Sequence, residues 1–126
     1  MKKIRVSEAT DSVLDWMVAK ALGLAYRNDE KYGSMCFRPS TTKGVIHWGS
    51  CPLPYSTDWA QGGRIIEMDR ICIDIGHDGV WLAYYKQNYD DEKEFMQSGS
   101  SPLIAAMRSY VAMRLGDFVD VPEELV

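Results

Sequence analysis

Hydrophobic residues recur at helical spacing in two segments, one near each end of the chain. Residues 11–22 have apolar positions three and four apart, which predicts an amphipathic helix. Residues 102–115 have the same period. Ser101 is suited to the N-cap of this second helix, Pro102 to its first helical position and Gly116 to its end.

The middle of the chain has the two-residue alternation of β-strands. Residues 71–75 place isoleucine at every second position, and a glycine-bounded turn leads into the apolar, aromatic residues 80–85. This pattern predicts a hairpin. Residues 88–101 are acidic and then rich in serine and glycine, which predicts a surface loop. A further strand is predicted at residues 64–67, and short candidate strands are predicted at residues 35–38 and 44–48.

These elements predict an α+β fold. We expect a small, mainly antiparallel β-sheet with an N-terminal and a C-terminal helix packed on it. The length of 126 residues and an apolar fraction of 46% indicate one domain, residues 1–126, with a substantial core.

Composition narrows the class of protein. The net charge of −4 argues against long nucleic acid as the main partner, although a small nucleotide needs only one or two arginines. No apolar run approaches the roughly 20 residues of a membrane helix. The basic N-terminus is not followed by an apolar signal core, so we expect a cytosolic protein.

The sequence contains no familiar catalytic or metal-binding pattern. The cysteines Cys36, Cys51 and Cys72 form no CxxC pair, so we expect reduced structural thiols. His47 and His77 lack zinc spacing, and neither is paired by sequence with a nucleophile, although a general base is not excluded. Phosphate-binding glycine loops and hydrolase motifs are missing. We therefore predict no enzyme activity, no cofactor and no metal.

One short segment, residues 55–63, combines aromatic, hydroxyl, carboxylate and amide side chains with two adjacent glycines. Such a segment is a poor core strand and is typical of a ligand-binding loop, because glycines allow close backbone approach and positive φ. The alternative is a tight connection in which Asp58 caps a turn, Trp59 fills the core and the glycines form the bend. The candidate ligand contacts here are Tyr55, Ser56, Thr57, Asp58, Trp59, Gln61, Gly62 and Gly63.

Two arginines of the second helix and one strand aromatic are further candidates. Arg108 falls at the edge of the apolar stripe, where it would hold an anion or form a surface ion pair. Arg114, in the last turn, would bind a ligand or the final helix carbonyls. Trp81 would stack on a base or pack in the core.

Three segments carry a family resemblance, in the same order along almost the whole chain. They are residues 14–20 (LDWMVAK), residues 55–67 (YSTDWAQGGRIIE), and a C-terminal group formed by 103–112 (LIAAMRSYVA), 115–117 (LGD) and 121–125 (VPEEL). With these segments the chain resembles the NinX-like family of small phage and prophage proteins. The likeness is weaker between residues 28 and 54.

A second, more distant resemblance suggests an activity. The strand core, the C-terminal helix, and a strand aromatic placed before a helix arginine are similar to the first anti-Thoeris protein family, phage proteins that bind a cyclic ADP-ribose isomer without cleaving it. Some members also bind cyclic oligonucleotides, and they are oligomers with ligand sites between subunits. This resemblance implies that Trp81 stacks on adenine, that Arg108 holds phosphates, and that residues 55–63 supply polar contacts.

Three functions are therefore to be weighed. The first is a sponge for a cyclic nucleotide-type immune signal in the host cytoplasm, formed by a homo-oligomer such as a dimer or hexamer. The second is a phage accessory protein that binds a host protein. The third is a small hydrolase of such a signal, which would use His47 or His77 with Asp58.

Overall fold

The fold is taken from a computed structural model, which describes residues 1–23, 26–29, 33–39, 46–50, 53–86 and 92–126. Three helices, eight strands and two short 3₁₀ turns make up these residues. In chain order they are β1 (Lys2–Arg5), a 3₁₀ turn (Val6–Glu8), α1 (Asp11–Ala21), β2 (Tyr26–Asp29), β3 (Gly33–Pro39), β4 (Ile46–Ser50), α2 (Trp59–Asp69), β5 (Cys72–Ile75), β6 (Trp81–Lys86), β7 (Lys93–Gly99), α3 (Pro102–Leu115), β8 (Phe118–Val121) and a 3₁₀ turn (Glu123–Leu125).

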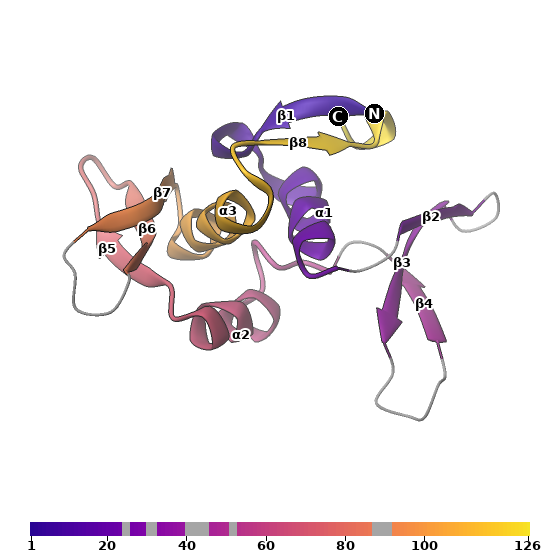
Figure 1. Ribbon diagram of the computed structural model, residues 1–126, viewed down its shortest axis with the longest axis horizontal. Helices are drawn as coiled ribbons and strands as arrows, with labels where there is room; N and C mark the ends of the chain where they lie inside the picture. The colour runs from indigo at the N-terminus through magenta and orange to yellow at the C-terminus, as the bar shows by residue number, and fades with distance from the viewer. Residues whose placement is uncertain (24–25, 30–32, 40–45, 51–52, 87–91) are drawn as a thin grey trace.

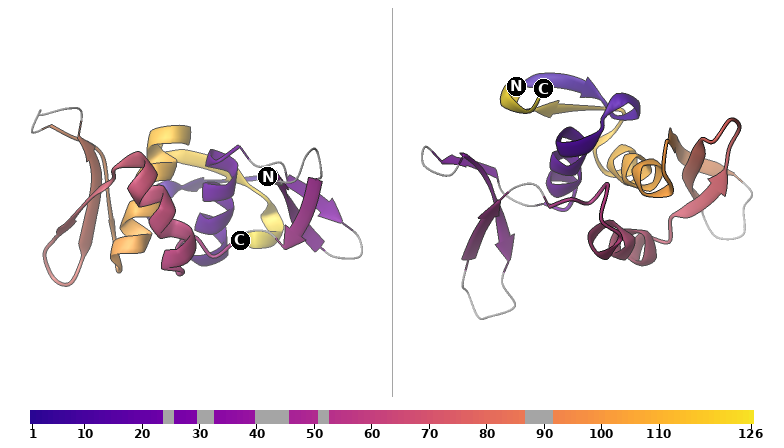
Figure 2. Two further views of the ribbon diagram at one scale, coloured as in Figure 1. Left: turned by 90° about the horizontal axis from the view of Figure 1, so that it is seen from below. Right: turned by 180° about the vertical axis from the view of Figure 1, so that it is seen from behind.

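Helix α3 is the centre of the fold. It packs against the sheet β5–β6–β7 on one side and against α1 on another, while α2 closes the core from below (Figures 1 and 2). The core side chains that are almost fully buried include Met107 and Tyr110 of α3 and Leu14 and Met17 of α1. Burial of each such side chain contributes roughly 1.5–3 kcal/mol, so the contact between α1 and α3 stabilises the body of the protein.

The boundaries of α3 are set by local signals, as predicted. The Ser101 Oγ accepts a hydrogen bond from the Ile104 N–H at 3.1 Å. Pro102 occupies the first turn, and Gly116 ends the helix at φ 91°, a conformation that glycine adopts at low cost. The predicted N-terminal helix is also confirmed, as α1.

The predicted α+β class is confirmed, and the strands are divided among three antiparallel sheets. These have the orders β1–β8, β2–β3–β4 and β5–β6–β7. The first sheet joins the two ends of the chain, with Arg5 opposite Phe118 and Lys2 opposite Val121 (Figure 1). The predicted strands at 35–38 and 44–48 correspond to β3 and β4, except that residues 44–45 lie outside the described residues.

The predicted hairpin is formed by β5 and β6. Val80 N–H donates to the His77 carbonyl at 3.1 Å across the turn. The two central residues, Asp78 and Gly79, have φ of 56° and 75°, which defines a type I′ turn. The twist of this turn matches that of the strands, so the local sequence is enough to set the register.

The predicted strand at residues 64–67 is wrong, because these residues lie in the middle of α2. The Asp58 carboxylate accepts from the Ala60 N–H at 2.9 Å and starts the helix, and Arg70 ends it in the left-handed conformation. The adjacent Ile65 and Ile66 gave a strand-like pattern. In the helix Ile65 is buried and Ile66 is partly buried against the core.

The predicted loop at residues 88–101 is also wrong over most of its length. Residues 93–99 form β7, which pairs with β6, and residues 88–91 lie outside the described residues. The ladder shifts register near Ala83 and Tyr85, and Phe95 has φ 55°. This irregularity breaks the two-residue alternation that identifies strands in a sequence.

No helix among the described residues is long and apolar enough to cross a membrane.

Candidate functional site

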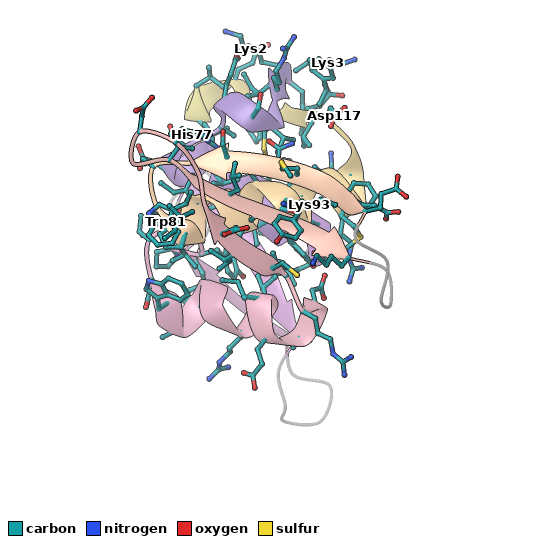
Figure 3. The ribbon with its side chains drawn as sticks, turned by 90° about the vertical axis from the view of Figure 1, so that its left-hand side faces the viewer. Lys2, Lys3, His77, Trp81, Lys93 and Asp117 are labelled. Carbon is teal, nitrogen blue, oxygen red and sulfur yellow. The ribbon has the colours of Figure 1, made fainter. Side chains whose placement is uncertain are left out.

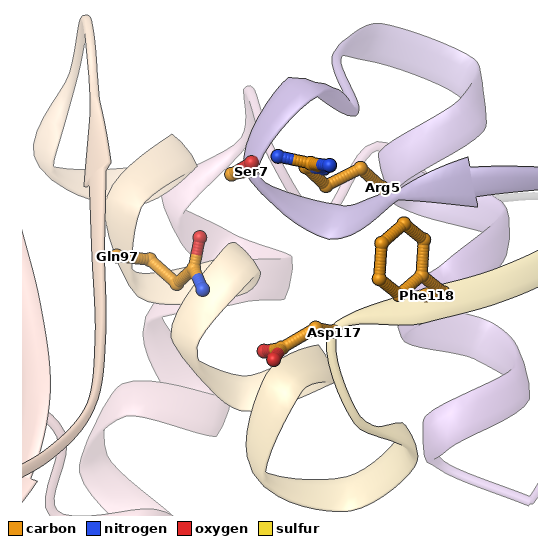
Figure 4. A pocket seen from close by; sticks show the side chains of 5 residues that line it. All are labelled: Arg5, Ser7, Gln97, Asp117 and Phe118. Atoms are coloured by element: carbon orange, nitrogen blue, oxygen red, sulfur yellow. The ribbon is translucent and has the colours of Figure 1, made fainter.

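A pocket of about 340 Å³ opens between the terminal ribbon β1–β8 and strand β7. Five side chains surround it, and they come from three segments that are far apart in sequence, residues 5–7, residue 97 and residues 117–118 (Figure 4). Its volume lies at the lower end of the range for small-molecule sites. The pocket is lined by Arg5, Ser7, Gln97, Asp117 and Phe118.

Arg5 provides the positive charge of this pocket. It lies directly opposite Phe118 in the β1–β8 ladder, and its guanidinium carbon is 5.3 Å from the centre of the Phe118 ring. Arg5 forms no ion pair with a carboxylate of any described residue. A cation held over an aromatic ring without a counter-ion is well suited to binding an anion.

Asp117 brings a negative charge to the same pocket. Its carbonyl accepts from the Val6 N–H at 2.9 Å, which ties the start of β8 to the residue after β1. The carboxylate is exposed and lies across the pocket from the Arg5 guanidinium, with the Gln97 amide between them and the sheet (Figure 4). The pocket is therefore polarised, with a cationic end and an anionic end.

Arg108 does not line the pocket, and its side chain donates to two backbone carbonyls. Its Nε donates to the Ala9 carbonyl at 2.9 Å, and its Nη1 donates to the Ser98 carbonyl at 2.8 Å. The side chain is buried, and burial lowers the pKa of the guanidinium. These carbonyls belong to residues close in sequence to Ser7 and Gln97, so Arg108 holds two walls of the pocket together. Arg108 forms no ion pair with a carboxylate of the described residues, unlike the surface ion pair that was one interpretation of the sequence, and its contact with a ligand stays a prediction.

Residues 55–63, predicted to be a loop, form a turn followed by the first turns of α2. Gly62 and Gly63 do not have positive φ. The absence of a Cβ at Gly62 allows contact with the Tyr55 carbonyl and with Leu103, which explains that glycine by close packing. The expectation of a glycine bend is therefore wrong.

The polar residues of this segment serve the start of α2 in part. The Ser56 N–H donates to the buried Asp15 carboxylate at 2.7 Å, and burial raises the pKa of that carboxyl. Asp58 caps the helix, as the alternative interpretation expected, whereas Trp59 is 54% exposed and does not fill the core. None of the residues predicted here, including Tyr55, Thr57 and Gln61, lines the pocket.

Trp81 and Arg114 lie apart from the pocket as well. Trp81 is partly buried against the core, and it lies at a different edge of the molecule from Asp117 (Figure 3). The Arg114 guanidinium carbon is 5.5 Å from the centre of the Tyr110 ring. Nearby, the Tyr85 hydroxyl donates to Asp69 at 2.9 Å, and burial together with this carboxylate raises the pKa of Tyr85. A role of Trp81 or Arg114 in ligand binding stays a prediction.

The five lining residues were not found from the sequence. Their only local signal is an exposed aromatic, Phe118, beside Asp117 and directly after the helix stop at Gly116. The pocket forms because the two ends of the chain pair as β1 and β8. The spacing of hydrophobic residues along the sequence does not predict this pairing.

Two sequence-based expectations concern cysteines and metals. Cys72 is free, and the side chains of the other two cysteines lie outside the described residues. In the part of the chain that the structure describes, no three His, Cys, Asp or Glu residues gather as a metal site would require.

Comparison with known proteins supports the phage resemblance. A search of curated proteins found no match. Residues 5–114 match the family described as bacteriophage P22, NinX. This match spans most of the chain and includes α1, α2 and nearly all of α3, so the protein belongs to the phage P22 NinX family.

Proposed function

We propose that this NinX-family protein is a phage anti-defence sponge, which binds a cyclic nucleotide-type immune signal and withholds it from its receptor without cleaving it. A cyclic ADP-ribose isomer is the first ligand to test, followed by cyclic oligonucleotides. The observation that carries the proposal is the polarised pocket, in which Arg5 has no carboxylate partner among the described residues.

The chemistry of the pocket fits a nucleotide in one orientation. The Arg5 guanidinium and the Ser7 hydroxyl offer donors to a phosphate. The half-exposed Phe118 ring offers a surface to a base, and stacking of this kind is worth about 1–3 kcal/mol. Gln97 can both donate to and accept from a base edge. Asp117 would repel phosphate and accept from ribose hydroxyls or an exocyclic amine, which fixes the direction of the ligand.

Binding without cleavage requires no activated nucleophile. The five lining residues include no histidine and no cysteine. The Ser7 hydroxyl is their only nucleophile, and the Asp117 carboxylate is the only side chain among the other four that could act as its general base. A sponge needs affinity alone, and a cation, an aromatic ring, an amide and a carboxylate supply it.

The proposal is tested by calorimetric titration with cyclic ADP-ribose isomers and cyclic di- and trinucleotides, followed by heating and chromatography of the released ligand. We expect saturable binding and release of intact ligand. Arg5→Ala should weaken binding at least tenfold, because a charge-assisted hydrogen bond to phosphate is lost. Lys2→Ala, on the same strand, is the matched control and should bind normally. Products of hydrolysis, or wild-type affinity in Arg5→Ala, would contradict the proposal.

Binding of a host protein is a second candidate, and one observation favours it. Trp59 lies in the first turn of α2 and is 54% exposed, which is unusual because tryptophan side chains are mostly buried. Tryptophan is enriched in protein interfaces, so an exposed one is a candidate partner contact. Affinity capture from host lysate with the wild type and with Trp59→Ala tests this function. A partner retained by the wild type and lost from the variant would favour it, and identical capture profiles would count against it.

A further inference from the structure

Two lysines converge on one aromatic ring at the face of the sheet β5–β6–β7 that is turned away from the core. Ala83 of β6 belongs to the core, and Tyr85 packs against it. Because side chains alternate along a strand, Tyr84 points to the opposite face, where Lys93 also lies (Figure 3). The Nζ atoms of Lys86 and Lys93 are 5.9 Å and 4.9 Å from the centre of the Tyr84 ring. The two lysine side chains therefore cover this ring, which is 6% exposed.

The two lysines are also direct neighbours across the strands. Lys86 is opposite Lys93 in the ladder between β6 and β7. Like charges that face each other in this way destabilise an antiparallel pair. Neither lysine forms an ion pair with a carboxylate of the described residues, so no counter-ion from that part of the chain offsets the repulsion. Asp90 and Asp91, in the segment that connects the two strands, lie outside the described residues.

A shift of register in the sheet creates this like-charge pair. The pairing at the start of β6, continued without the shift, would place Lys86 opposite Glu94, a favourable pair of opposite charges. One extra residue in β7 places Lys93 there instead. Within the shift Phe95 has φ 55°, which is strained for a bulky residue, and Ser109 donates to its carbonyl at 2.8 Å. The fold thus maintains a strained residue and a charge repulsion that its sequence could avoid, and such costs are found at functional sites.

We propose that Lys86 and Lys93 form a second ligand site, which binds the terminal phosphate group of a small molecule. A phosphate monoester carries a charge of about −1.5 to −2 at pH 7, which balances two ammonium groups, whereas a single carboxylate balances one. Its oxygens can accept hydrogen bonds from both lysines at once.

This site is separate from the pocket, which neither lysine lines. It also selects a different ligand, because the cyclic nucleotides proposed for the pocket have no terminal phosphate. The inference therefore does not depend on the function proposed for the pocket.

NMR titration of the whole protein with inorganic phosphate and with glycerol 3-phosphate tests the site, since neither probe has a base that could enter the pocket. At low ionic strength we expect saturable shifts of the backbone amides of residues 84–86 and 93–94. Lowering the pH from about 7.5 to about 5 should weaken binding, because a phosphate monoester loses its second negative charge near pH 6. The absence of saturable shifts, or shifts confined to the pocket, would overturn the proposal.

Replacing either lysine by glutamine should weaken binding of glycerol 3-phosphate at least tenfold, because the dianion then meets one ammonium group instead of two. Lys20→Gln is the matched control. The Lys20 Nζ is 5.5 Å from the centre of the Trp16 ring, so this variant also removes a lysine from an aromatic ring but leaves both site lysines in place. Wild-type affinity in Lys93→Gln, or equal weakening in Lys20→Gln, would contradict the assignment.

Charge reversal separates ligand binding from folding. Lys86→Glu places a carboxylate opposite Lys93, so at low salt its thermal unfolding midpoint should lie above that of the wild type while phosphate binding is lost. A variant that is more stable and yet does not bind cannot owe its loss of binding to unfolding. A lowered midpoint, or unchanged phosphate affinity, would overturn the proposal.

Two other occupants of the lysine pair are tested in the same titration. If the connecting segment occupies it, the double variant Asp90→Asn with Asp91→Asn should bind phosphate at least tenfold more tightly than the wild type. If an acidic protein segment is the natural partner, a glutamate-rich peptide should bind more tightly than glycerol 3-phosphate and lose affinity in Lys93→Gln. Either result would overturn the assignment of this site to a phosphate ligand.

Discussion

Replacing Arg108 with alanine is expected to lower the free energy of unfolding by about 2–5 kcal/mol. The change removes the guanidinium donor from the carbonyls of Ala9 and Ser98, of which the hydrogen bond to Ala9 is buried and the one to Ser98 is partly buried. A buried polar group that loses its partner costs about 1–3 kcal/mol. The lost guanidinium also leaves a cavity between α3, β7 and the start of α1. Urea denaturation followed by circular dichroism measures the effect.

Arg114→Ala is the matched control on the same helix. Arg114 is exposed and lies over the Tyr110 ring, a contact worth about 0.5–1 kcal/mol at most at an exposed site. The variant Arg108→Lys tests whether stability depends on the positive charge of this side chain or on the geometry of its guanidinium. A lysine keeps the charge but lacks the planar fork that donates to two separate carbonyls, so this variant should also be destabilised.

The stability of Arg108→Ala also decides between two roles for this residue. A wild-type unfolding midpoint together with lost ligand binding would mean that Arg108 contacts the ligand, as the anti-Thoeris resemblance implies. A lowered midpoint with ligand binding weakened in proportion to unfolding would mean that it supports the pocket through Ser7 and Gln97. The two hydrogen bonds to backbone lead us to expect the second result.

Elements whose signals are local were predicted from the sequence. The second helix, residues 102–115, was predicted with its cap, its first-turn proline and its terminal glycine, because those three residues act within a few positions of each end. The Asp78-Gly79 turn likewise defined its hairpin. These features require no knowledge of the rest of the fold.

Elements whose structure depends on tertiary contacts were not predicted from the sequence. Helix α2 contains two adjacent glycines, which lower helix propensity, and only packing of Gly62 against Tyr55 and Leu103 explains why the first of them is suited to a helix there. Strand β7 was not predicted because its register shift and the positive φ of Phe95 break the two-residue alternation, and contacts with α3 help to hold it in place. Arg108 donates to the Ser98 carbonyl, and Ser109 donates to the Phe95 carbonyl at 2.8 Å.

The candidate pocket depends on the same long-range contacts. Arg5 and Phe118 become neighbours only when the two ends of the chain pair, and Gln97 joins them from β7. Residues 55–63 are a more conspicuous segment of the sequence, because their polar and aromatic side chains predict ligand contacts. In the structure Asp58 and Gly62 of this segment start and pack a helix.

The adjacent glycines of α2 offer a sharp test of this packing, since replacement by alanine should have opposite effects at the two positions. A Cβ at Gly62 would overlap the Tyr55 carbonyl oxygen and lie 2.7 Å from Leu103 Cδ1. Backbone cannot yield as a flexible side chain does, so Gly62→Ala should be destabilised by about 2–4 kcal/mol, although overpacking more often costs about 1–3 kcal/mol.

Gly63→Ala should instead be neutral or more stable than the wild type by up to about 1 kcal/mol. Its Cβ would meet only the Trp59 ring, at 3.4 Å, and alanine is about 1 kcal/mol better than glycine inside a helix. Thermal unfolding of both variants gives the comparison, with the midpoint of Gly62→Ala below the wild type and that of Gly63→Ala at or above it. Equal shifts in one direction would mean that α2 does not approach Tyr55 and Leu103 as closely as the structure has it.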